Sequence, residues 1–193
     1  VTKINPKNCN AHNNLAVLYK NLGEYENSIK CFKKIISLEP KNTSAYNNLG
    51  HTLQLLSQTQ KAIDSFETTL KIKPNDQVAH FQLGLIFYMT KQYKIASKHF
   101  ALTNLSTSKC YLLNCLFEMN EKSEFLELLN KILEVGEVNS MIGSICLRAE
   151  MKYGIDKKNP FCKDPLNYVI KKDLTKIYDF ENIFVKSVKN VLS

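Results

Sequence analysis

The chain has 193 residues, a hydrophobic fraction of 44% and a formal net charge of +8. A hydrophobic fraction of this size is typical of a globular protein with one or two domains and excludes a disordered chain. No stretch approaches the roughly 18–20 apolar residues of a transmembrane helix, and the N-terminus lacks the pattern of a signal peptide, so we expect a cytoplasmic protein with no membrane partner.

The basic charge and the six cysteines are the two features of composition that could indicate a specific chemistry. Arg148 is the only arginine among the 26 basic residues, whereas recognition of phosphates and bases usually depends on arginine. We therefore expect a solvated lysine-rich surface and no nucleic-acid partner, with a basic binding face as the alternative. None of the cysteines forms a C-x-x-C pair, so we expect free thiols and neither a metal nor another cofactor.

The apolar residues recur at helical spacing and predict helices that follow one another in pairs. Gly23 fits the turn inside the first pair because glycine readily adopts the left-handed conformation of a helix end. Pro40 and Pro74 are expected to end the second helix of the first and second pairs. The predicted helices span about 10–21, 25–37, 43–56, 59–72, 77–90, 93–104, 107–119, 122–135 and 138–152.

One pattern recurs along these pairs with a spacing of about 34 residues. The segment Asn47-Asn48-Leu49-Gly50 repeats Asn13-Asn14-Leu15-Ala16, and later positions stay in phase with it. Small residues would let the two helices of a pair approach closely, and phenylalanines would fill the space between pairs. The matched series are Leu15, Leu49 and Leu83; Ala16, Gly50 and Gly84; Ser28, Ala62 and Ala96; Phe32, Phe66 and Phe100; and Pro6, Pro40 and Pro74.

This pattern resembles the tetratricopeptide repeat family. The resemblance implies an all-α fold, a right-handed α-solenoid of antiparallel helix pairs that must stack to bury their apolar faces. It places repeats at about 9–42, 43–76 and 77–108, a degenerate repeat at 106–137 and an extra helix at 138–152, so that residues 1–153 form the solenoid. The family holds other proteins or peptides, and we expect such a scaffold, without catalytic activity, in this chain.

The two ends of the chain carry further expectations. Ile4-Asn5-Pro6-Lys7-Asn8 matches Leu38-Glu39-Pro40-Lys41-Asn42, as if more repeats preceded it, and an uncovered first pair could support homo-oligomers through the solenoid ends. Residues 154–193 are predicted to form a loop and a last helix at about 180–192, which either caps the solenoid or opens a further domain.

A second, short resemblance concerns Asn159-Pro160-Phe161-Cys162-Lys163-Asp164-Pro165-Leu166. This segment looks like the linker that joins such repeats to a 2-oxoglutarate and iron dependent oxygenase domain in some bacterial proteins. It leaves open an alternative function, a substrate-recruiting or oligomerising module of a larger enzyme. None of the four histidines is followed two residues later by Asp or Glu, so the iron ligands of that class would lie outside this chain.

In the repeat family the first helices of the pairs line a concave groove. The residues expected there are Asn13, Asn14, Val17, Asn47, Asn48, His51, Phe81, Gln82 and Leu85. The amides of Asn14, Asn48 and Gln82 share one repeat position and resemble the asparagine ladder of protein O-GlcNAc transferase, which grips peptide backbones; simple solvated amides are the alternative. A two-carboxylate clamp for chaperone C-termini is not expected, because Asn48 alone fits its pattern.

Overall fold

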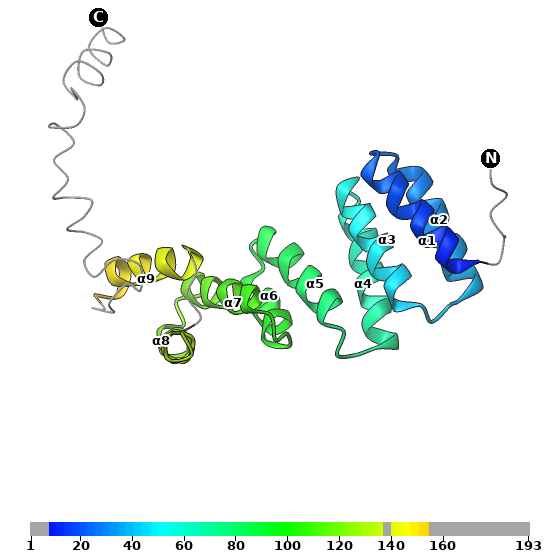
Figure 1. Ribbon diagram of the computed structural model, residues 1–193. Helices are drawn as coiled ribbons and strands as arrows, with labels where there is room; N and C mark the ends of the chain where they lie inside the picture. The colour runs from blue at the N-terminus through cyan, green and yellow to red at the C-terminus, as the bar shows by residue number, and fades with distance from the viewer. Residues whose placement is uncertain (1–7, 137–139, 155–193) are drawn as a thin grey trace, which may run out of the picture. The chain divides into compact units, whose positions relative to one another are not determined.

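The structure is a computed structural model that describes residues 8–136 and 140–154. Every regular element in these two ranges is an α-helix (Figure 1). The chain divides into two compact units, Val1–Leu128 and Leu129–Ser193, which are taken separately below. The helices are α1 (Cys9–Asn21), α2 (Tyr25–Leu38), α3 (Thr43–Leu55), α4 (Thr59–Ile72), α5 (Gln77–Met89), α6 (Tyr93–Ala101), α7 (Ser106–Glu118), α8 (Lys122–Glu134) and α9 (Ser140–Tyr153).

The first helix of each of the three regular pairs starts with the same side-chain cap. Asn8, Asn42 and Asp76 precede α1, α3 and α5, and the side chain of each accepts a hydrogen bond of 2.9–3.0 Å from the backbone N–H three residues later. Such a cap satisfies one of the otherwise unpaired donors at a helix start and contributes about 1 kcal/mol. The caps recur with the repeat spacing, so each pair begins in the same register.

The turns inside the pairs all place one residue in the left-handed region of backbone conformation. Gly23 has φ +78°, as its sequence position predicts, whereas the later pairs use Ser57 at 57°, Lys91 at 60° and Asn120 at 62°. The turn geometry therefore repeats even where the glycine does not. The second helices α2 and α4 end at Leu38 and Ile72, two residues before Pro40 and Pro74, which confirms the predicted role of these prolines.

Helix α6 is shorter than predicted, because it ends at Ala101 and not near residue 104. The backbone N–H and the side chain of Thr103 both donate to the carbonyl of Phe100, at 3.1 and 2.9 Å. The N–H of Asn104 donates to the side chain of Gln77 on α5, at 2.8 Å. These bonds draw the chain out of the helix before the degenerate fourth pair begins.

The core of each pair is a small residue on the first helix that faces a phenylalanine on the second. Phe32, Phe66 and Phe100 are at most 1% exposed. A Cβ atom added at Gly50 or Gly84 would lie only 2.8 Å or 2.6 Å from the ring of Phe66 or Phe100. The close approach expected from the repeat is therefore confirmed, whereas Phe66 and Phe100, which were expected between pairs, pack against the glycine of their own pair.

Stacking of successive pairs completes the core of the first unit. Helix α2 packs on α3, α4 on α5 and α6 on α7. At the last of these junctions the rings of Phe100 and Tyr111 stack with centroids 5.2 Å apart, and Phe81 meets both edge-on. This arrangement of antiparallel pairs is the α-solenoid that the sequence predicts (Figure 1).

In the second unit, the described residues belong to the end of α8 and to α9. Helix α9 matches the helix predicted at 138–152 and buries one face, which consists of Ile142, Ile145, Cys146 and Ala149. The segments 4–7, 159–166 and 180–192 lie outside the described residues, so the division of the chain near residue 153 stays a prediction. Within the described ranges, no helix combines the length and apolar character that a membrane span requires.

Candidate functional site

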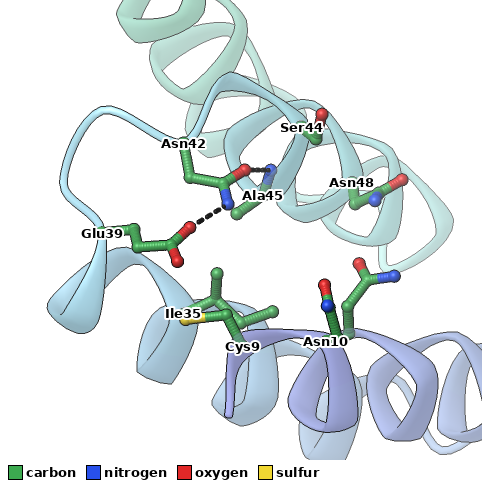
Figure 2. A pocket seen from close by; sticks show the side chains of 9 residues that line it. Cys9, Asn10, Ile35, Glu39, Asn42, Ser44, Ala45 and Asn48 are labelled. Atoms are coloured by element: carbon green, nitrogen blue, oxygen red, sulfur yellow. Dashed lines mark hydrogen bonds between the residues drawn. The ribbon is translucent and has the colours of Figure 1, made fainter. Parts of the chain in front are cut away.

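A polar pocket of about 300 Å³ lies where α1, the end of α2 and α3 meet (Figure 2). Three elements that the repeat brings together supply its walls. Its lining residues are Cys9, Asn10, Asn13, Ile35, Glu39, Asn42, Ser44, Ala45 and Asn48.

One side of the pocket is held rigidly by hydrogen bonds. Asn42 donates from Nδ2 to Oε2 of Glu39 at 2.6 Å, and its Oδ1 accepts from the N–H of Ala45 at 2.9 Å (Figure 2). The same amide thus caps α3 and orients the carboxylate. The Asn42 bond, and then a bond from the Cys9 thiol, hold the pKa of Glu39 below its ordinary value, whereas burial and the carboxylate raise the pKa of Cys9. Glu39 is therefore a fixed negative charge at neutral pH.

The other side of the pocket carries polar groups that the fold leaves free. The side chains of Asn10, Asn13, Ser44 and Asn48 make no hydrogen bond to any residue in the described part of the chain. An amide offers both a donor and an acceptor, and a backbone peptide unit needs one of each. The buried side chains of Ile35 and Ala45, each 2% exposed, also contribute to the lining. The arrangement suits a polar ligand that also presents some apolar surface.

Two of the predicted groove residues, Asn13 and Asn48, meet in this pocket. Asn14 lies on α1 with its side chain exposed and is not part of the lining, and Gln82 is half-buried on α5. Asn14, Asn48 and Gln82 still occupy equivalent positions on α1, α3 and α5, so the ladder they would form stays a prediction.

Two other predicted groove residues, at a single repeat position, contact neighbouring elements. Asn47 donates from Nδ2 to Oδ1 of Asp76 at 3.0 Å, which ties α3 to the cap of α5. Burial alone would raise the pKa of Asp76, but hydrogen bonds from the N–H of Ala79, Asn47 and Lys73 outweigh it and lower the pKa. Phe81 is the equivalent residue on α5 and packs against the ring of Tyr111 on α7. This position therefore joins neighbouring pairs.

Val17, His51 and Leu85 share the remaining groove position, and all three are half-buried. Leu85 packs with the cluster around Phe100. The Nδ1 atom of His51 is buried without a partner in the described part of the structure, and burial, followed by the charge of Lys20, lowers the pKa of its imidazole. A neutral His51 could accept or donate a hydrogen bond in the groove.

Sequence reasoning named two of the nine described pocket residues, and Asn10, Ser44 and Glu39 are among those that it missed. Asn10 and Ser44 are 34 residues apart and so occupy the same repeat position. Comparing all positions of the repeat, and not only those next to the leucine series, would have found them. Glu39 has no such signal, because the equivalent residue of the second pair is Lys73. Only the fold of the link between α2 and α3 brings its carboxylate to the pocket.

Two histidines, His80 and His99, join elements of the third pair. The Nε2 atom of His80 lies 2.8 Å from the carbonyl oxygen of Pro74, and its Nδ1 lies 3.1 Å from Nδ1 of His99. A carbonyl can only accept, so Nε2 of His80 carries the proton and Nδ1 accepts from His99. The His99 ring also stacks on Phe87 at 5.8 Å. The pair joins α5, α6 and the link before α5.

Comparison with protein families agrees with this architecture. Two models, each described as a tetratricopeptide repeat, match residues 9–42 and 31–64. Residues 9–64 are tetratricopeptide repeats. The third pair continues the same sequence phase, and the chain shares the fold of such repeats. No curated protein sequence matches the chain.

Several solved structures share the fold of these tetratricopeptide repeats. A crystal structure of MamA is 21% identical, with 70% of this chain and 82% of that chain covered and a TM-score of 0.62. A MamA structure from Desulfovibrio magneticus RS-1, running from residue 41 to the end, is 18% identical, with 74% and 85% covered and a TM-score of 0.62. PilF from Pseudomonas aeruginosa is 13% identical, with 75% and 68% covered and a TM-score of 0.60.

Proposed function

We propose that this repeat protein is a non-catalytic scaffold that binds an extended segment of another protein along the first helices α1, α3 and α5. The family supports a protein-binding role, because stacked helix pairs present a continuous surface to a partner. The observation that carries the proposal is the pocket between α1 and α3, where Asn13 and Asn48 face the same space without partners in the described structure.

The physical basis of binding is the pairing of side-chain amides with peptide units. Each such hydrogen bond adds only about 1 kcal/mol net, so useful affinity needs several of them along the groove. Asn14, Asn48 and Gln82 recur with the repeat spacing and would extend the contact beyond the pocket. An extended ligand rises about 3.3 Å per residue, so a segment of some 6–10 residues would reach across three repeats.

The test is titration of a library of ten-residue peptides against the wild type and two sets of variants. Asn13→Ala with Asn48→Ala removes the amides of the pocket, and the triple change of Asn14, Asn48 and Gln82 to Ala removes the ladder. Loss of one of these amides alone should weaken binding about fivefold, and the double and triple variants should weaken it severely.

The matched control is Gln60→Ala, which removes an exposed amide from α4, a second helix outside the proposed groove. Its affinity should equal that of the wild type. Binding that survives both sets of variants would reject the amide groove, and a steep loss of affinity with salt would favour a lysine-rich surface in its place.

A further inference from the structure

The pocket between α1 and α3 has an asymmetric distribution of charge. Glu39 is the one charged side chain among the described residues that line it, and none of these residues is a lysine or an arginine. This local negative charge lies in a chain whose formal net charge is +8. We infer that the pocket takes a basic side chain, lysine or arginine, of the bound segment; the inference rests on the proposed function and names one specificity of the groove.

The carboxylate of Glu39 lies at the solvent-exposed edge of the pocket, where Asn42 orients it. Asn42 donates to Oε2 at 2.6 Å. A carboxylate has about four acceptor sites, so this bond leaves capacity for an ammonium or guanidinium group. Orientation before binding reduces the entropy lost when the ion pair forms.

The remaining lining suits the rest of a basic residue. Figure 2 shows Glu39 and Asn42 on one side of the pocket, Asn10 and Asn48 on the other, and Ile35 between them. The aliphatic stem of lysine or arginine could lie over Ile35 while its charged head reaches Glu39. The free amides opposite could then pair with the backbone of the same residue.

The repeat itself indicates that this preference belongs to a single position of the ligand. In the second pair the residue equivalent to Glu39 is Lys73, which lies 3.2 Å from Asp76, the cap of α5. The residue equivalent to Ser44 is Val78, so one polar group of the opposite wall is missing there as well. The next link therefore carries no free carboxylate for a second basic side chain.

The experiment uses the full chain and the same ten-residue peptide library. The library should enrich peptides with lysine or arginine at one fixed position. For the best such peptide, replacing that residue by norleucine, and separately changing Glu39→Gln, should each lower affinity about two- to fivefold, the range for a solvent-accessible ion pair. The two changes together should cost no more than either alone, because they remove the same contact.

Two further variants separate charge from structure. Glu39→Gln keeps an acceptor for Asn42, and Glu67→Gln removes an exposed acid on α4 as a control that should leave affinity unchanged. Glu39→Lys copies Lys73 and should reverse the preference toward acidic peptides. A merely structural Glu39 would instead weaken all peptides alike, and that result would overturn the inference.

The outcomes also distinguish the inference from the proposed function. Peptides that bind through Asn13 and Asn48 but ignore both the basic residue and Glu39→Gln would overturn the inference and leave the amide groove intact. Absence of binding by every peptide would overturn both.

Discussion

Gly50 on α3 reports how closely the two helices of the second pair approach each other. A Cβ atom added there would lie 2.8 Å from Cε1 and Cζ of the Phe66 ring, whereas ordinary contact begins at 3.4 Å. The ring is 0% exposed, so it has no open space into which to retreat. At so short a distance overpacking costs about 2–3 kcal/mol, the upper part of its usual range, and the better helix propensity of alanine offsets about 1 kcal/mol of it. We expect Gly50→Ala to lower the free energy of unfolding by about 1–2 kcal/mol.

Urea unfolding followed by far-ultraviolet circular dichroism measures this change. The matched control is the same substitution in a Phe66→Leu background, where the ring is gone and the added methyl group has room. There Gly50→Ala should cost less than about 0.5 kcal/mol, so the two sites should be coupled by about 1 kcal/mol or more. A Gly50→Ala variant as stable as the wild type, or more stable, would show that the ring does not cover Gly50 and would refute the packing within the pair.

Four further predictions concern stability and assembly. Phe66→Ala should lower the free energy of unfolding by about 3–5 kcal/mol in urea titration, and a change below about 1 kcal/mol would mean that the residue is not in the core. Ser57→Gly should raise the free energy of unfolding by about 0.5–1 kcal/mol and so raise the melting temperature, because Ser57 has φ 57° in the turn and glycine adopts this conformation without strain. A lower melting temperature would contradict this prediction. Burial lowers the pKa of His99, so the unfolded state binds a proton at a higher pH than the folded state, and the free energy of unfolding should be constant above about pH 6.5 and fall below it. In unfolding measured at several pH values, His99→Gln should reduce this fall. An unchanged dependence on pH would exclude the contact between His80 and His99 as its source. Leu15 is only half-buried in the first pair, so light scattering should show association at high concentration, and a strictly monomeric protein would argue against contacts through that end.

The sequence predicted the fold of the first unit because the same pattern of residues recurs in each copy of the repeat. Each copy combines a helical apolar pattern, a small residue on the first helix, a phenylalanine on the second, and a proline link. Agreement between copies removes the ambiguity that a single helical pattern would leave, and it placed Phe32, Phe66 and Phe100 in the core. The repeat pattern is less informative after residue 104, because Ser108 stands where the proline would be expected. Helix α6 accordingly ends three residues earlier than predicted.

The candidate site was only partly predictable, because equivalent positions in a repeat need not have equivalent environments. The sequence alone determined that the first helices carry amides at regular spacing, and it named Asn13 and Asn48. Only the tertiary structure decided that these two share a pocket, that Asn47 instead bonds Asp76, and that Glu39 lies beside them. The physical reason is that local spacing specifies which residues share a helix face, whereas the link between α2 and α3 determines which side chains from different helices meet.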